Sequence, residues 1–238
     1  LIGVDCEDIV IIENIEDLSF IGAMLAAGSK MDESHLEEID NKFKNKGCTV
    51  PVCNAYGQNE HCGGITYNTI NSNRRGSAGK VAYGTRIMIV NPETKEELPL
   101  NEVGKIVEQS DSQFLGYNHN PEADKASIFI DKDGEKWFDT KDLGCFDEDE
   151  FLHIFDRESR AIIRFDNKIA LAKIEDKFLK SNNVEDAIVV KVNVPGPFGM
   201  DQAPFAYVMV NDEKDKISYD EMIGKMQTSS YPFTMLEI

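Results

Sequence analysis

The residues from 54 to 60, Asn-Ala-Tyr-Gly-Gln-Asn-Glu, are of the kinds that bind a nucleotide. The ring of Tyr56 offers a flat face for a base, and the glycine after it lets a ligand approach the backbone closely. The amide of Asn59 can meet an oxyanion, and the carboxylate of Glu60 is a hard oxygen ligand that suits Mg²⁺. Taken alone the segment is a weak indication, because a core aromatic at the end of a strand also explains Tyr56.

A second polar pair, Asp142 and Arg157, follows downstream. The sequence between them predicts a strand hairpin, which would return the chain to the same pocket edge and bring the two side chains together. The alternatives are a carboxylate in a turn and an arginine on the surface. Together with the first cluster, the pair favours a nucleotide site.

A strand, a helix and a second strand are predicted upstream of Tyr56. The apolar run at residues 20–27 predicts the first strand, which ends at Gly28. Asp32 is a suitable N-cap for the helix. Its apolar face consists of Leu36, Ile39 and Phe43. Residues 49–53 predict the next strand, and this order of elements favours parallel pairing. Ligands collect beyond the carboxyl ends of such strands, where we expect Gly28 and Tyr56.

After residue 75 the pattern changes. Short apolar runs alternate with turn signals, which is typical of a small antiparallel barrel or sandwich. The predicted strands are residues 86–90, 104–108, 136–139 and 151–155. The acidic segment 131–134 lacks the distal glutamate of a calcium loop, so a solvated turn is the favoured interpretation.

The last part of the chain predicts a compact α+β unit. Its expected strands are residues 161–163, 187–192 and 205–210, and its expected helices are 171–178 and 218–226. The fold we predict is therefore mixed α/β and α+β, in three parts. Residues 1–75 are the end of an α/β subdomain, 76–158 a small antiparallel β-barrel, and 159–238 a compact α+β C-terminal lid domain.

Composition limits the function further. With 238 residues the chain can hold one large domain or two modest ones. Its net charge of −18 argues against nucleic-acid binding, because phosphate contacts need clustered Lys and Arg. The five cysteines form no obvious disulfide framework, so we expect a reducing, cytoplasmic setting. Cys53, His61 and Cys62 could hold a metal, but buried or incidental thiols are the preferred interpretation. No signal peptide or membrane-spanning run is visible.

Three stretches resemble the adenylate-forming, AMP-binding superfamily, which includes acyl-CoA synthetases, adenylation domains of peptide synthetases, and luciferases. Residues 56–60, Tyr-Gly-Gln-Asn-Glu, are similar to the family's Tyr-Gly-x-Thr-Glu. Residues 137–144, Trp-Phe-Asp-Thr-Lys-Asp-Leu-Gly, are similar to Trp-Phe-x-Thr-Gly-Asp-Leu-Gly. Asp156-Arg157, followed by Ile162-Ile163-Arg164 and Ile174-Glu175, is similar to the family's hinge and the first helix of its C-terminal domain. The motifs keep the family's order over nearly the whole chain, which therefore resembles the C-terminal portion of an acyl-CoA synthetase-like enzyme.

The resemblance implies a role for each matching position. Tyr56 would stack on adenine. Asn59 would face the α-phosphate and Glu60 would hold Mg²⁺, which makes these two residues the catalytic candidates. Asp142 would accept hydrogen bonds from both ribose hydroxyls, and Arg157 would contact the ribose from the other side. The further nucleotide-binding candidates are Gly28, Ser29, Lys30, Asn54, Ala55, Gly57 and Gln58, and the hinge candidate is Ser159.

The resemblance also implies a reaction. A small carboxylic acid and ATP would give an acyl-adenylate and pyrophosphate, and CoA would then form the thioester and release AMP. The implied ligands are thus ATP or AMP, Mg²⁺ and CoA, and the implied setting includes fatty acid metabolism. Two alternatives stay open: an adenylation domain that loads an amino or hydroxy acid onto a carrier protein, and a degenerate AMP-binding module without catalysis.

The chain departs from the family pattern in several places. Lys141 replaces the glycine of the Thr-Gly-Asp motif, and Phe165-Asp166 replaces a Gly-Gly pair whose loop runs beside the thiol's tunnel. The family's phosphate loop and C-terminal lysine have no counterpart in this sequence, so we expect a fragment with little ligase activity of its own. His61 follows Glu60, where it could line the acyl pocket or be a hydrogen-bonded core residue.

Overall fold

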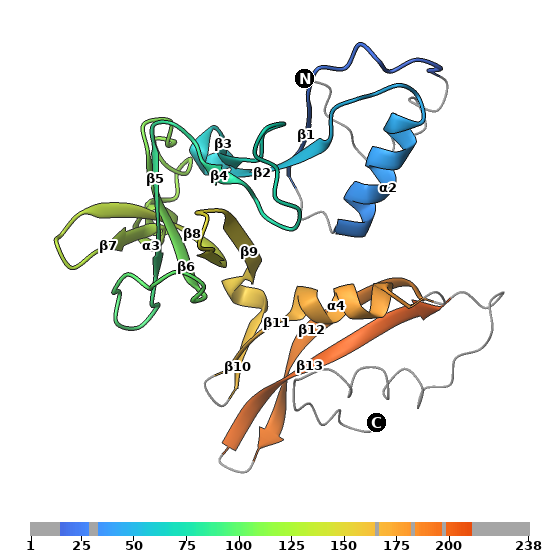
Figure 1. The fold of residues 1–238 in the computed structure, drawn as a ribbon. Coiled ribbons are helices and arrows are strands. Elements are labelled where there is room, and N and C mark those ends of the chain that lie inside the picture. The colour runs from blue at the N-terminus through green and yellow to red at the C-terminus, as the bar shows by residue number, and fades with distance from the viewer. Residues whose placement is uncertain (1–14, 29–32, 165–166, 182–183, 197–198, 211–238) are drawn as a thin grey trace. The chain divides into compact units, whose positions relative to one another are not determined.

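The computed structural model describes residues 15–28, 33–164, 167–181, 184–196 and 199–210. The chain divides into two compact units, with the boundary between Glu158 and Ser159 (Figure 1). The mixed α/β character that the sequence predicts is confirmed. The three-part division and the role of the second unit as a lid stay predictions. Among the helices described, none is long and apolar enough to cross a membrane.

The first unit opens with the predicted strand, helix and strand. Strand β1 (Met24–Ala26) pairs in parallel with β2 (Val52–Gln58), and Met24 lies opposite Val52, which confirms the predicted pairing. Helix α2 (Glu33–Lys44) lies between them in sequence, with acidic Glu33 in its first turn and lysines in its last, as the helix dipole favours. Its predicted apolar face is confirmed, because Leu36 and Phe43 are buried and Ile39 packs against the core.

Two strand boundaries differ from the prediction. β1 starts only at Met24, and the side chain of Phe20 is 68% exposed. β2 continues through Tyr56 and Gly57, so the predicted end of this strand at residue 53 is wrong. The reason is pairing with β3 (Gly63–Tyr67), whose register shifts between Tyr56 and Gly57. A Cβ on Gly57 would overlap the carbonyl oxygen of Gly63, so the glycine serves close strand pairing rather than a turn.

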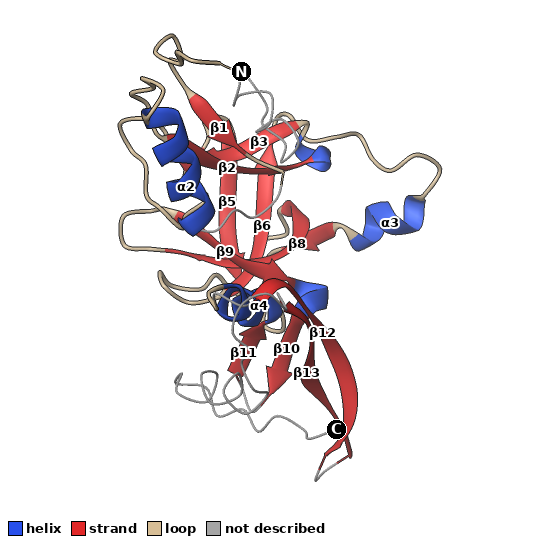
Figure 2. Cartoon of the chain, turned by 90° about the vertical axis from the view of Figure 1, so that its right-hand side faces the viewer, coloured by secondary structure: helices blue, strands red, loops and turns tan. Residues whose placement is uncertain are grey.

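A curled antiparallel sheet forms the rest of the first unit, as expected of a barrel-like part. Figure 2 shows its long strands β5, β6 and β8 in red. The sheet consists of β5 (Thr85–Val90), β6 (Gly104–Ser110), β8 (Lys136–Phe146) and β7 (Ile128–Ile130) in that order, with β9 (Leu152–Arg157) paired to β8. The smaller elements are η1 (Asn59–His61), β4 (Lys80–Val81), α3 (Pro121–Ala126) and η2 (Glu158–Arg160). The core lies on both faces of β5 and β6, around Val90, Ile106 and Val107.

Strand β8 is longer than predicted. It does not end at Asp139 but runs to Phe146, and Lys141 takes a φ of 61° within it. Asp142 is therefore a strand residue, and the alternative of a carboxylate in a turn is wrong. Residues 142 and 157 are direct cross-strand partners in the β8–β9 hairpin, as the sequence predicts for a hairpin that returns to the same edge.

The second unit has its own core. The hairpin of β10 (Ala161–Arg164) and β11 (Asn167–Ala170) precedes helix α4 (Leu171–Leu179), which packs on the longer hairpin of β12 (Val184–Gly196) and β13 (Gly199–Val210). The predicted helix face is confirmed, since Leu171, Ile174 and Phe178 are buried. β12 and β13 extend well beyond the predicted strands and include prolines, which two-stranded sheets tolerate because each strand is an edge. The predicted helix at 218–226 lies outside the described residues.

Candidate functional site

Two polar side chains from distant strands meet in the first unit. The phenol of Tyr56 on β2 donates a hydrogen bond of 2.6 Å to Oδ2 of Asp142 on β8. The amide of Gln58 donates to the same oxygen at 2.6 Å and to the carbonyl of Thr140 at 2.9 Å. The ring of Tyr56 also packs against the hydrophobic core around Ile106. Tyr56 is therefore in part a core aromatic, as the alternative interpretation holds. These contacts join β2 to the curled sheet at the place where the sequence predicts a ligand.

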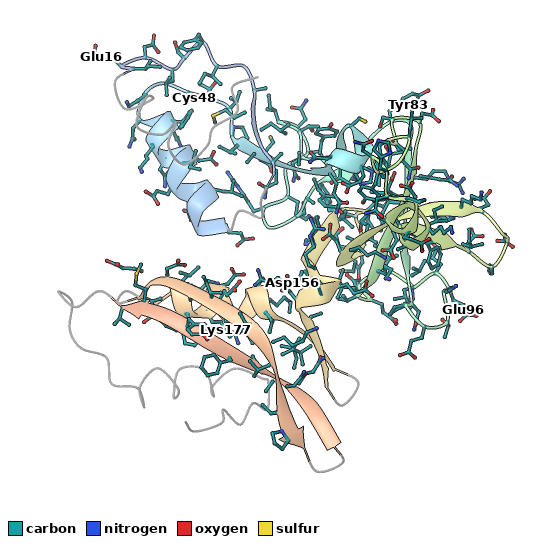
Figure 3. All side chains as sticks on the ribbon, turned by 180° about the vertical axis from the view of Figure 1, so that it is seen from behind. Glu16, Cys48, Tyr83, Glu96, Asp156 and Lys177 are labelled. Carbon is teal, nitrogen blue, oxygen red and sulfur yellow. The ribbon has the colours of Figure 1, made fainter. Side chains whose placement is uncertain are left out.

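Asp142 is the centre of this cluster. Its other oxygen, Oδ1, lies 3.0 Å from Nε of Arg157, whose side chain is 56% exposed. Asp156, beside Arg157 in β9, marks this part of the chain in Figure 3. Burial raises the pKa of Asp142, and hydrogen bonds from Tyr56 and Gln58 and the charge of Arg157 oppose that rise. Burial also raises the pKa of Tyr56, together with the charge of Asp142, so the phenol is a donor and the carboxylate an acceptor.

The site has two foci. The first is the Asp142 cluster, and the second is Glu60, which lies in the short η1 turn. Its Oε1 accepts a hydrogen bond of 2.8 Å from the phenol of Tyr117, and its carbonyl accepts one of 2.7 Å from the backbone of Phe114. Burial, with the hydrogen bond and charge of Glu60, raises the pKa of Tyr117 to about 12. The sequence analysis missed Tyr117 and the contacts of Gln58. The only signal for Tyr117 was a Gly-Tyr pair just before Asn120.

A pocket of about 240 Å³ is lined by Gln58 and Arg157, which contact Asp142, and by Glu60, whereas Tyr56 and Asp142 themselves are not part of its lining. Its lining carries the carboxylates of Glu60 and Asp139 and the cations of Lys141 and Arg157. The remaining lining residues are Gln58, Tyr117, Ala123, Ala126, Ser127, Phe138 and Thr140. A small cavity with opposed charges on its walls can bind a ligand that has both anionic groups and hydrogen-bond donors.

Lys141 brings a cation into this pocket at a glycine-like position. Its φ of 61° lies in the left-handed region, which glycine adopts without steric cost. This conformation explains why the family's Thr-Gly-Asp motif has glycine at this position. The ammonium group lies 2.6 Å from Asp139 and donates to the carbonyl of Ala126 at 2.9 Å. Lys105 approaches the same carboxylate at 3.0 Å, so two lysines share Asp139.

Other candidates lie apart from these foci. Asn59 is exposed at the start of η1 and does not line the pocket. Gly28 follows β1 with a φ of 96°, and Asn54 and Ala55 lie earlier in β2. Ser159 is exposed and is the first residue of the second unit. Ser29, Lys30 and the altered loop at residues 165–166 lie outside the described residues. The roles assigned to all these positions stay predictions.

No group of three or more His, Cys, Asp or Glu side chains that could hold a metal occurs among the residues that the structure describes. Cys53, His61 and Cys62 do not form such a group in the described part of the chain. Cys53 and His61 are buried and Cys62 is exposed.

Comparison with known proteins shows which family the chain resembles. The AMP-binding enzyme family matches residues 8–118. The chain belongs to the AMP-binding enzyme superfamily. Among its AMP-binding relatives, the 2-succinylbenzoate–CoA ligase of Bacillus licheniformis is 32% identical over 210 residues, which are 87% of this chain and 40% of that protein. The luciferin 4-monooxygenase of Luciola mingrelica is 30% identical over 181 residues, which are 76% of this chain and 31% of that protein.

Solved structures of AMP-binding enzymes share the fold. The O-succinylbenzoate coenzyme A synthetase of Bacillus subtilis, in complex with ATP and magnesium ion, is 26% identical with a TM-score of 0.74. That similarity covers 94% of this chain and 44% of that one. The chain thus spans less than half the length of each of these three proteins. Over the part that it spans, the chain is similar to acyl-CoA ligases of the AMP-binding superfamily.

Proposed function

We propose that the protein takes part in the ATP-dependent activation of a carboxylic acid. The acid and ATP give an acyl-adenylate and pyrophosphate, and CoA then accepts the acyl group as AMP leaves. The observation that carries this proposal is the contact between Tyr56 and Asp142, which joins two sequence motifs. Their chain neighbours Gln58 and Lys141 line the pocket. The likeness to acid–CoA ligases and to a synthetase solved with ATP supports it.

In this proposal the nucleoside binds at the Asp142 cluster. A carboxylate with two acceptor oxygens suits the two adjacent hydroxyls of a ribose. Both oxygens already accept contacts, from Tyr56 and Gln58 on one side and Arg157 on the other. The two ribose hydroxyls would therefore take the places of two of these three donors, and the ring of Tyr56 would lie against the adenine.

The residues at the other focus fit a magnesium ion. Mg²⁺ is commonly bound through one or two carboxylates together with substrate phosphates, rather than by a closed protein cage. Glu60 lines the pocket with one oxygen held by Tyr117, and no cage of three acidic or histidine ligands surrounds it in the described part of the chain. Glu60 would hold the ion, which would offset the charge on the departing pyrophosphate. Asn59, at the start of the same turn, would donate to the α-phosphate.

The test is the affinity of the chain for AMP, measured by titration calorimetry. Replacing Asp142 with alanine removes the ribose acceptor, so we expect AMP to bind about tenfold or more weakly, the loss typical of hydrogen bonds to a charged group. Asp111→Ala is the matched control, since Asp111 is an exposed acid of the same unit. Equal AMP affinity in the Asp142→Ala and unchanged chains would contradict the assignment.

The alternative of an AMP-binding module without ligase activity has one observation in its favour. Lys141, which stands where the family's Thr-Gly-Asp motif has glycine, places its ammonium group in the pocket. Pyrophosphate release is measured with a panel of carboxylic acids. Because we expect little ligase activity from this chain in either case, only turnover decides between the two functions, and it would exclude a module without catalysis. Loading of a carrier protein in place of CoA, the identity of the acid and the cytoplasmic setting stay predictions.

A further inference from the structure

A buried pair of ionisable side chains lies directly behind Glu60. The ring of His61 and the carboxylate of Glu108 are both fully inaccessible to solvent, and Nδ1 of His61 lies 2.7 Å from Oε1 of Glu108. The alignment of this contact is not that of a good hydrogen bond, and Nε2 of His61 and Oε2 of Glu108 have no hydrogen-bond partner among the described residues. His61 belongs to η1, whereas Glu108 belongs to β6 of the curled sheet.

Stability alone does not account for this pair. Taking two such groups out of water is costly, and well-packed apolar residues of similar volume in their place are often neutral or stabilising. The pair has apolar neighbours: Glu108 lies opposite Ile87 and Phe138 in the adjacent strands, and the ring of His61 meets Phe138 edge-on at 5.4 Å. The pair therefore calls for a role beyond packing.

The position of the pair suggests that role. The η1 turn has three residues, and no side chain caps its start at Gln58. It is fixed from outside instead: Tyr117 holds the carboxylate of Glu60, Phe114 holds its carbonyl, and Glu108 holds the next residue, His61.

The aromatic rings link these anchors to one another. Phe114 meets Tyr117 at 4.8 Å and Phe138 at 5.7 Å, and Phe138 lines the pocket. A shift of His61 would thus be transmitted both to Glu60 through the backbone and to the pocket wall through Phe138.

We propose that the His61–Glu108 pair is a positioning device for Glu60, which ties the metal-binding turn to the curled sheet. This inference rests on the proposed function, because it takes Glu60 as the magnesium ligand. The pair acts on the bound metal and phosphates through Glu60. The ribose contacts would come from Asp142, whose own contacts are with Tyr56, Gln58 and Arg157 and not with the pair. Residues that orient a metal ligand commonly change metal affinity by 10- to 100-fold when they are replaced.

The experiment compares two affinities in the 238-residue chain. One is for AMP in the presence of EDTA, and the other is for the Mn²⁺ complex of ATP, with Mn²⁺ as the probe for Mg²⁺. The main variant is His61→Leu with Glu108→Met, which replaces both groups at similar volume and leaves no buried charge unpaired. We expect about tenfold weaker binding of Mn²⁺–ATP, unchanged AMP affinity and no loss of unfolding cooperativity.

A second variant keeps the test decisive if the double replacement does not fold. Glu108→Met alone leaves His61 in place without its partner, and we expect the same selective loss of Mn²⁺–ATP affinity. Glu108→Gln keeps the shape and one acceptor for His61, so we expect it to retain most of the affinity. Selective loss in either methionine variant, with rescue by glutamine, supports the proposal.

Three results overturn it in distinguishable ways. Unchanged Mn²⁺–ATP affinity, or equal losses for both ligands, makes the pair purely structural. AMP binding by the unchanged chain without any binding of Mn²⁺–ATP removes the metal role of Glu60 but leaves the nucleoside site. Failure of the unchanged chain to bind AMP defeats the proposed function itself.

Discussion

At the residue scale, the candidate site depends on donors that already satisfy a buried carboxylate. The phenol of Tyr56 gives Asp142 a hydrogen bond of 2.6 Å, and Asp142 is only 4% exposed. When the hydrogen-bond partner of such a buried group is removed, the folded chain loses stability, because no water molecule replaces the lost hydrogen bond. The ring of Tyr56 and its hydroxyl thus have separable functions, one toward a ligand and one toward the fold.

The Tyr56→Phe variant separates them. It keeps the ring and removes the donor, so we expect the free energy of unfolding to fall by about 1.5–3 kcal/mol while AMP affinity stays within a few-fold. Urea unfolding and calorimetry measure the two quantities. Tyr83→Phe is the control, since Tyr83 is fully exposed and should change stability by less than about 0.5 kcal/mol. A loss of AMP affinity as large as that of Asp142→Ala would show that the hydroxyl contacts the nucleotide.

A variant at Gly57 tests whether this glycine is needed for the close pairing of β2 and β3. An added Cβ would overlap the carbonyl of Gly63 and lie 2.7 Å from Cα of Gly64, both backbone atoms. Gly57→Ala must therefore push β2 and β3 apart, and we expect it to destabilise the first unit by about 1–3 kcal/mol in denaturant unfolding. Gly22→Ala is the matched control, because nothing lies within 4 Å of its Cβ position. Equal stability of the two variants would contradict the close pairing.

At the scale of elements, the sequence predicts the helices and their buried faces, which depend on local residue spacing. It misses the strand ends and the contacts that depend on pairing between strands. The apolar spacing of α2 and α4 specifies both helices and their buried faces. β2 and β8 exceed their predicted ends because pairing with β3 and β9 continues each strand past the end of its local apolar run. The motifs indicated Asp142 and Arg157. The contacts of Gln58 and Tyr117 arise only when β2, β8 and the loop before α3 come together.

An ion-pair network fixes one of these elements, the β8–β9 hairpin. Asp147 in its turn accepts hydrogen bonds from Arg74 at 2.6 Å, from His153 at 2.8 Å and from the backbone of Phe151 at 2.9 Å. The guanidinium of Arg74 also lies 4.6 Å from the ring centre of Phe151. Partial burial would raise the pKa of Asp147, but the hydrogen bonds from His153, Phe151 and Arg74 outweigh it and hold the pKa below its usual value.

The lowered pKa predicts how stability depends on pH. Asp147 stabilises the folded chain above its unfolded pKa of about 3.9, and this contribution is lost as the pH falls through the lower folded value. Asp147→Asn should therefore lower the thermal midpoint at neutral pH, and its difference from the unchanged chain should shrink as the pH falls below about 4. Scanning calorimetry between neutral and acid pH measures this. Asp133→Asn, in an exposed turn, is the control, and a pH-independent deficit in Asp147→Asn would refute the ionic origin.

At the scale of the whole molecule, each unit contains its own hydrophobic core. The first has buried clusters around Ile106 and Val107, and the second has one around Ile162, Leu171 and Val189. All residues of the proposed nucleotide site, from Tyr56 to Arg157, belong to the first unit. Nucleoside binding should therefore depend on the stability of the first core and be insensitive to that of the second.

Paired core variants test this independence. Leu171→Ala and Ile106→Ala each remove a buried aliphatic side chain, 1% and 0% exposed, and each should cost its own unit about 2–5 kcal/mol. Hydrogen exchange should show lost protection in α4 and in β12 for Leu171→Ala, with the strands of the first unit and AMP affinity unchanged. Ile106→Ala should do the reverse and weaken AMP binding, because Ile106 packs in the cluster that supports Tyr56. Loss of protection in both units from either variant would mean that the cores unfold as one, and the hinge expected at Ser159 would then lack the two independent bodies that it needs.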